Sequence, residues 1–137
     1  MKDEKPILLV EDDLVDMMSV KRALRDLQVT NPLHHVGNGE EALAWLRDPK
    51  NPRPAIILLD LNMPRMNGHE FLAIAKKDEA IRRIPVVVLT TSRAEADKVQ
   101  SFDLGVAGYM VKPVDFQQFV DVMRTIRLYW TLSELPD

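Results

Sequence analysis

Four hydrophobic runs in this sequence each end on a residue type that can take part in phosphoryl chemistry. The endings are an acidic triplet, a lone aspartate, a hydroxyl group and a lysine. In chain order they are Glu11-Asp12-Asp13 after Ile7–Val10, Asp60 after Ile56–Leu59, Thr90 after Val86–Leu89 and Lys112 after Tyr109–Val111. Carboxylates bind divalent cations, and a carboxylate can attack phosphorus to form an acyl phosphate. If these endings meet, the sequence predicts a cation site with a phosphoryl acceptor at Asp60.

The acidic residues predict the ligands of the cation. Crowded carboxylates repel one another, and a divalent cation relieves that repulsion. Mg²⁺ usually takes one or two carboxylates and keeps several waters, so Asp12 and Asp60 are predicted as direct ligands and Glu11 as a partner acting through water. Helix capping alone would also explain an acidic triplet after a strand, and capping is the role expected for Asp13.

The residues around the acceptor also have ordinary explanations. Asp60 precedes a loop shaped by Pro64 and Gly68, which predicts a rigid setting, although an aspartate there could simply cap a turn. The Thr90 hydroxyl could donate to a phosphoryl oxygen, but threonine often ends a strand. Lys112 lies between an apolar run and Pro113, where its ammonium could pair with Asp60 or the phosphoryl group. A cis Lys112–Pro113 bond would aim the lysine inward; the alternative is a surface lysine.

The runs are unbroken rather than alternating, which is typical of strands buried on both faces of a parallel sheet. The expected strand ends are 26, 23, 30 and 22 residues apart, close to the length of a strand–helix–strand unit, and lie near Val10, Val36, Leu59, Leu89 and Val111. The second strand, Leu33–Val36, is the weakest and is predicted at an edge. Five such units predict an α/β sheet with helices on both faces and ligands at the carboxyl ends of the strands.

Helix starts are marked by capping residues. Asp13 opens an expected helix from Leu14 to Leu27, and Asn38 with Glu41 opens a second. The third begins near Gly68, and Ser92 with Glu95 opens a fourth, which Gly105 would end; Asp115 with Gln118 opens the fifth. The fifth has a core-facing stripe of Phe116, Phe119, Val120, Met123, Ile126 and Trp130.

Composition narrows the class of protein. The chain has 137 residues, 46% of them hydrophobic and 28% charged, which predicts one globular domain over 1–137, with a core at 6–130 and a tail at 131–137. The net charge of -3 is unfavourable for a nucleic-acid partner. The absence of cysteine excludes disulfides and thiolate chemistry. No run is long enough for a signal peptide or a membrane span, so no membrane partner is expected and the cytoplasm is the default location.

In the order and spacing of these residues the chain resembles a receiver domain of the two-component response regulators, from about Pro6 to Trp130. The resemblance implies a flavodoxin-like (βα)5 three-layer sandwich with sheet order 2-1-3-4-5. It implies that Asp60 accepts a phosphoryl group from the phosphohistidine of a histidine kinase. The residues it implies for the site are Asp12, Asp60 and the Asn62 carbonyl for Mg²⁺ (with Mn²⁺ or Ca²⁺ as substitutes), Glu11 through water, Thr90 and Lys112 for the phosphoryl group, and Tyr109 with Thr90 as the switch.

Two positions depart from the family pattern. Thr91 stands where many members carry alanine or another small residue, and it would crowd the entry to the site. Glu11 stands where many members have aspartate, and its longer arm would shift its contact with the metal. Neither departure removes a required group. The subgroup that the chain resembles most is the stand-alone receivers paired with bacterial phytochromes, through its Val10–Asp13 start, its Pro49–Pro54 loop and its Arg127–Trp130 tail.

The expected partners are proteins. No output domain is expected after the fifth helix, so the signal would leave through an unknown downstream protein or by transfer of the phosphoryl group. A second, partly apolar stripe on that helix suggests a homodimer formed with the neighbouring strand, unless it folds back on the domain; it consists of Val122, Thr125, Tyr129 and Leu132.

Two other hypotheses for the function compete with the phosphoryl-accepting switch. An aspartyl-phosphate hydrolase of the haloacid-dehalogenase type would need a second acid two residues after the nucleophile, where this chain has Asn62, and would need room for a cap. A receiver fold that serves only as a scaffold would not need the reactive set, yet every required group is present. The protein is therefore expected to be a signalling switch and not a conventional enzyme. At most, it would phosphorylate itself from small donors and slowly dephosphorylate itself.

Overall fold

The computed structural model describes residues 5–61, 63, 65–90, 108–111 and 116–133. Its centre is a parallel sheet in the order β2-β1-β3-β4-β5. The strands are β1 Ile7–Val10, β2 Leu33–Val36, β3 Ile56–Asp60, β4 Val86–Thr90 and β5 Gly108–Val111. The helices are α1 Leu14–Asp26, α2 Gly39–Arg47, α3 Gly68–Lys77 and α5 Phe116–Ser133.

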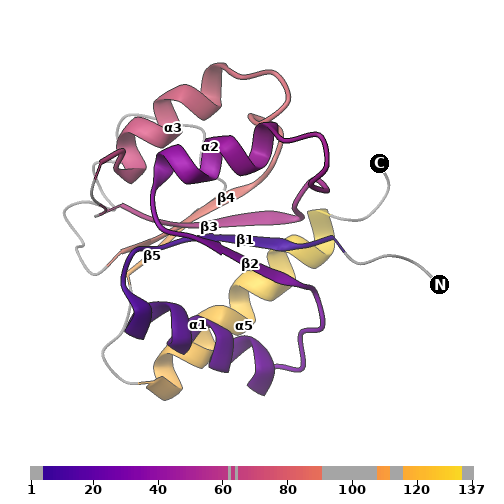
Figure 1. Cartoon of the computed structure of the whole chain (residues 1–137). Coiled ribbons are helices and arrows are strands. Elements are labelled where there is room, and N and C mark those ends of the chain that lie inside the picture. Colours follow the sequence, from indigo (N-terminus) through magenta and orange to yellow (C-terminus); the bar gives the residue numbers. More distant parts are fainter. Residues whose placement is uncertain (1–4, 62, 64, 91–107, 112–115, 134–137) are drawn as a thin grey trace.

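Helices cover both faces of the sheet. Figure 1 shows α2 and α3 on one face, and α1 and α5 on the other. The predicted α/β class, a parallel sheet between helices, is confirmed. The expected fourth helix, from Ser92 to Gly105, lies outside the described residues.

The central strands face two separate cores. Leu8 and Val10 of β1 pack with residues of α2 and α3, whereas Ile7 and Leu9 pack with residues of α1 and α5. Successive side chains of a strand point to opposite faces, so a strand covered on both sides must be apolar at every position. This double burial explains the unbroken runs in the sequence. β2 lies at an edge, as predicted, and is only partly buried.

Several element boundaries differ from the expectation. α1 ends at Asp26 rather than at Leu27, and β5 begins at Gly108 rather than at Tyr109. β3 and β4 each extend one residue further than the apolar run, so that Asp60 and Thr90 are the last residues of their strands. Backbone pairing continues through a polar residue, which hydrophobic patterning cannot detect. Helix α5 ends at Ser133 rather than at Trp130. Of its predicted core stripe, Phe119, Val120 and Met123 are buried, as expected.

The predicted caps hold the helices that begin beside the acidic rim. The Asp13 carboxylate accepts from the backbone N–H groups of Val15 at 2.8 Å and Asp16 at 3.1 Å. The Asn38 side chain accepts from the N–H of Glu41 at 2.9 Å and starts α2. Asp13 therefore acts as the cap that the sequence predicted, which leaves Glu11 and Asp12 for other roles.

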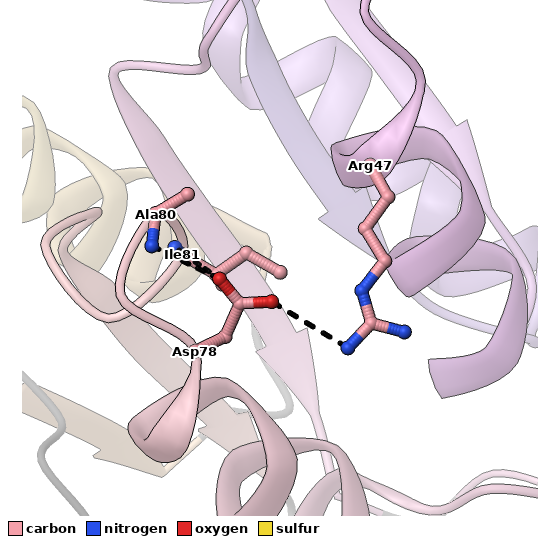
Figure 2. A network of polar contacts seen from close by, with 4 residues as sticks. All are labelled: Arg47, Asp78, Ala80 and Ile81. Carbon is pink, nitrogen blue, oxygen red and sulfur yellow. Dashed lines mark hydrogen bonds and ion pairs between the residues drawn. The ribbon is translucent and has the colours of Figure 1, made fainter.

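At the opposite end of the sheet, Asp78 organises the turn between α3 and β4 (Figure 2). Its carboxylate accepts from the N–H groups of Ala80 at 2.9 Å and Ile81 at 3.2 Å, and it pairs with the Arg47 guanidinium at 3.5 Å. The hydrogen bond from Ile81, with smaller contributions from Ala80 and Arg47, lowers the pKa of Asp78 below its ordinary value of 3.8, against a smaller opposing effect of burial. The contact joins the end of α2 to this turn.

Among the residues that the structure describes, no helix combines the length and the apolar character that crossing a membrane requires.

Candidate functional site

Strand register brings the carboxyl ends of the strands to one rim. Val10 pairs with Leu59, so the residues that follow, Glu11 and Asp60, lie at the same level of neighbouring strands. Asp60 in turn pairs with Leu89, the residue before Thr90. Thr90 pairs with Val111, the residue before Lys112. The carboxyl ends of β1, β3, β4 and β5 therefore share one edge of the sheet, as the sequence analysis predicted.

Three carboxylates converge at this rim. One oxygen each from Glu11, Asp12 and Asp60 lies within 4.8 Å of the others. Ligands on opposite sides of one Mg²⁺ lie about 4.2 Å apart, since each bond is roughly 2.0–2.1 Å long. The group is therefore compact enough to face one cation. The all-oxygen donor set also suits Mg²⁺ or Mn²⁺.

The three carboxylates differ in their access to solvent. Glu11 is 1% exposed and Asp60 is 8% exposed, whereas Asp12 is exposed. The Glu11 side chain accepts a hydrogen bond from the backbone N–H of Asp13 at 3.4 Å, so it also holds the loop between β1 and α1. Burial makes charge on Glu11 and Asp60 costly unless it is compensated, and a cation in this group would provide that compensation.

The loop after Asp60 is packed tightly against its own helix. The N–H of Gly68 donates to the carbonyl of Leu61 at 3.1 Å. A Cβ atom at position 68 would lie 2.7 Å from the Leu61 Cα and 2.8 Å from the Asp60 carbonyl oxygen, closer than backbone atoms allow. Glycine is therefore required where α3 begins, and the backbone of Asp60 is held against the start of that helix. Arg65 in the same loop has a φ of 61°, which a compact turn requires.

The remaining predicted residues are placed to different extents. Thr90 is completely buried at the end of β4. Asn62 and the Lys112–Pro113 bond lie outside the described residues, and so do Thr91 and Ser92. Tyr109 lies in β5, but the orientation of its side chain is not described. The roles of Asn62, Lys112 and Tyr109 therefore stay predictions.

The structure adds two contacts that the sequence analysis did not anticipate. The Nε2 atom of His35 lies at hydrogen-bonding distance from the Glu11 carbonyl oxygen. The N–H of Gly39 donates to the Met66 carbonyl at 3.0 Å. Neighbouring residues of a strand face opposite sides of the sheet, and on the side opposite to His35 the His34 ring stacks on Trp45, with ring centroids 4.9 Å apart. The acceptor for His35 depends on strand register, which no local pattern carries.

Comparison with known proteins agrees with this fold. Residues 7–124 match the profile of the response regulator receiver domain. Response regulator Rcp1 of Synechocystis sp. is 38% identical over 130 residues, which cover 92% of this chain and 88% of Rcp1.

Two crystal structures are similar over nearly the whole chain. The phosphorylated cyanobacterial phytochrome response regulator RcpA superposes with a TM-score of 0.84 at 39% identity, covering 93% of this chain and 94% of RcpA. The Mn(2+)-bound form of response regulator Rcp1 superposes with a TM-score of 0.82 at 36% identity, and 97% of each chain is covered.

These similarities, together with the acidic rim of a parallel sheet, define the class: the chain belongs to the response regulator receiver family. It is a phosphoryl-accepting signalling switch related to the phytochrome response regulators. Receiver domains bind Mg²⁺ or Mn²⁺ in an acidic pocket, and the group formed by Glu11, Asp12 and Asp60 is consistent with that property.

Proposed function

We propose that Asp60 of this receiver accepts a phosphoryl group from a phosphohistidine of a sensor histidine kinase, in a reaction that requires Mg²⁺. The observation that carries the proposal is the convergence of Glu11, Asp12 and Asp60 within 4.8 Å at the carboxyl edge of the sheet. Of the three, Asp60 has the setting expected of an acceptor: it ends a central strand and its backbone packs against a helix start.

The chemistry follows from the charges. A carboxylate oxygen of Asp60 attacks phosphorus, the bond between phosphorus and the donor imidazole nitrogen breaks, and that nitrogen takes up a proton. A bound Mg²⁺ would supply neutralisation of the negative charge shared by Asp60 and the phosphoryl oxygens. We assign Asp12, Asp60 and the Asn62 carbonyl as its ligands and Glu11 as a partner through water. The proposed contacts to the phosphoryl group are the Thr90 hydroxyl and the Lys112 ammonium.

The output is a change of surface. In this proposal Thr90 moves toward the phosphoryl group and Tyr109 turns inward. The proposed fold that carries this switch is a complete (βα)5 unit. β4 and β5 are neighbouring strands, and Thr90 pairs with Val111, two residues after Tyr109, which supports coupling between the two residues. A partner protein then reads the altered surface, as expected of a switch rather than a conventional enzyme.

The kinase is proposed to be of the phytochrome type, because RcpA, a phytochrome response regulator, covers almost the entire chain at 39% identity. A histidine kinase of another system is the alternative. A neighbouring kinase gene with a chromophore-binding domain would support the first, and one with a different sensor domain would support the second.

A homodimer through α5 and the neighbouring strand is proposed as the assembly. α5 packs on α1 and also continues to Ser133, beyond the expected core. Light scattering of a monomer at high micromolar concentration, with and without a phosphoryl donor, would contradict the dimer.

The acceptor assignment can be tested by intact mass. The protein is incubated with Mg²⁺ and acetyl phosphate, and a phosphoryl adduct is expected in the natural sequence but not in Asp60→Asn. The matched control is Asp78→Asn, which removes a carboxylate at the other end of the sheet and should leave the adduct unchanged. An adduct that persists in Asp60→Asn would assign phosphorylation elsewhere. Absence of any adduct, together with no binding of Mg²⁺ or beryllofluoride, would favour the scaffold.

A further inference from the structure

The connection between β2 and α2 touches both loops that carry the acidic group. At its start, the Val36 carbonyl accepts from the N–H of Glu11 at 3.0 Å. At its end, the N–H of Gly39 donates to the Met66 carbonyl at 3.0 Å, in the loop that follows Asp60. A Cβ atom at position 39 would lie 3.0 Å from that same carbonyl and closer still to the Met66 side chain. One short segment therefore braces the two loops against each other.

Next to Val36, the side chain of His35 also connects β2 to the loop of the acidic pair. Its Nε2 atom lies at hydrogen-bonding distance from the Glu11 carbonyl oxygen. A carbonyl oxygen can only accept, so Nε2 must carry the hydrogen and donate it. The two backbone contacts of the brace do not depend on side-chain identity, but this one does. It can therefore be removed by a single substitution.

The position of this bond matters because of peptide geometry. The Glu11 carbonyl and the N–H and Cα of Asp12 belong to one planar peptide unit. Fixing the carbonyl oxygen from the side of β2 therefore fixes the plane from which the Asp12 side chain projects. Asp12 is exposed, so the orientation of its carboxylate depends on its backbone more than on packing. In the next peptide unit, the N–H of Asp13 donates to the Glu11 side chain at 3.4 Å.

We propose that His35 is a positioning residue of the cation site: by donating to the Glu11 carbonyl it holds Asp12 in the orientation that binds the metal. This inference rests on the proposed function, because it concerns the cation that Asp12 would bind. Hydrogen bonds of outer groups to a metal-binding segment typically change metal affinity by about 10–100-fold when they are lost. Loss of the His35 hydrogen bond is expected to lower the affinity by an amount at the lower end of this range, because the Val36 carbonyl still accepts from the N–H of Glu11.

The test compares donors and non-donors at position 35 with a matched change next to it. His35→Val and His35→Phe remove the donor, and His35→Gln places an amide N–H at a similar reach. The control is His34→Val, the same substitution one residue earlier in β2, where the ring faces the other side of the sheet and stacks on Trp45. Mg²⁺ affinity is measured by titration calorimetry of each folded variant without phosphoryl donor. Amide hydrogen exchange of Asp12 and Asp13 is measured in metal-free protein.

The expected result is a loss of Mg²⁺ affinity of about tenfold in His35→Val and His35→Phe, with recovery to within roughly threefold in His35→Gln and little change in His34→Val. Faster exchange at Asp12 and Asp13 should accompany the loss. The proposal is overturned if a folded non-donor variant binds Mg²⁺ as tightly as the natural sequence, or if His35→Gln is as weak as the non-donors.

The two proposals fail in different ways. If the natural sequence binds no Mg²⁺, the proposed function is wrong, and hydrogen exchange in the metal-free protein then decides the role of His35 alone. Unchanged exchange at Asp12 and Asp13 in His35→Val or His35→Phe would overturn it. If the natural sequence binds Mg²⁺ and the non-donors do so equally well, only the role of His35 is wrong.

Discussion

At the scale of single residues, the three consecutive acids have three different tasks. Glu11 is buried and accepts from the N–H of Asp13, Asp12 is the solvent-exposed member of the acidic group, and Asp13 caps α1. The same side-chain chemistry is thus divided by backbone position. Type and spacing in the sequence were enough to predict the cap at Asp13, because a cap must immediately precede its helix. The metal-binding roles of Glu11 and Asp12 stay predictions.

Adjacent carboxylates give a matched pair for testing the metal assignment. Asp12→Asn should weaken Mg²⁺ binding at least roughly tenfold, since a proposed direct ligand loses its charge. Asp13→Asn removes the same charge one residue later, but asparagine caps helices as well as aspartate does, so α1 is preserved. Its Mg²⁺ affinity, measured by calorimetry, should stay within about threefold of the natural value. Equal losses in the two variants would mean that only the total charge of the rim matters.

Two kinds of contact could not be predicted from the residue types: hydrogen bonds to backbone carbonyls and close approaches between backbone segments. Acceptors that are backbone carbonyls, such as that of Glu11 for His35, leave no mark in residue type. The near contact at Gly68 is a similar case: a glycine at a helix start has several explanations, and only coordinates show that Leu61 excludes a side chain.

At the scale of elements, the start of α3 fixes the loop that follows Asp60. Gly68→Ala should therefore lower the free energy of unfolding by about 1–3 kcal/mol, because the added methyl group must displace backbone atoms of Leu61 and Asp60. Gly37→Ala is the control, since a Cβ there would meet only Glu41 side-chain atoms at 3.6 Å or more. Urea unfolding of both variants measures the difference, and similar stabilities would show that the loop yields without cost.

The elements themselves were largely predictable from the sequence. The apolar runs and capping residues gave the order and approximate ends of the described strands and helices. Some of the errors came where a regular element continues beyond the apolar pattern, as Asp60 and Thr90 do in their strands, and at the end of α5. Both kinds of continuation depend on backbone hydrogen bonds, which side-chain patterns report only indirectly.

At the scale of the whole molecule, the two ends of the sheet have separate groups of polar side chains. The acidic rim lies at the carboxyl ends of the strands, whereas Asp78 precedes β4 and joins the α3–β4 turn to α2 (Figure 2). The pKa of Asp78 is lowered, chiefly by the hydrogen bond from Ile81. Its contribution to stability is therefore complete above the ordinary value of 3.8 and is lost as the pH falls through its lower folded-state pKa.

Asp78→Asn should accordingly flatten the fall in unfolding free energy between about pH 5 and pH 3, because asparagine does not titrate. The amide oxygen can still accept from Ala80 and Ile81, so the turn remains capped. Mg²⁺ affinity near pH 7 should be unchanged within roughly twofold, since the site lies at the other end of the sheet. Urea titrations across this pH range and calorimetry give both readouts. A parallel loss of affinity would mean that the two ends are coupled.

The placement of β2 has a consequence for how the domain opens. β1 and β3, which lead into the acidic residues, are central strands, whereas the contacts of His35 and Gly39 come from an edge strand and its connection. Edge segments detach at a lower free energy than the global transition. A partial opening of β2 would therefore slacken the loop of Asp12 while the interior pairing of β1 with β3 persists. The affinity for the cation would then decrease when the edge strand β2 opens locally, under conditions in which the domain as a whole is still folded.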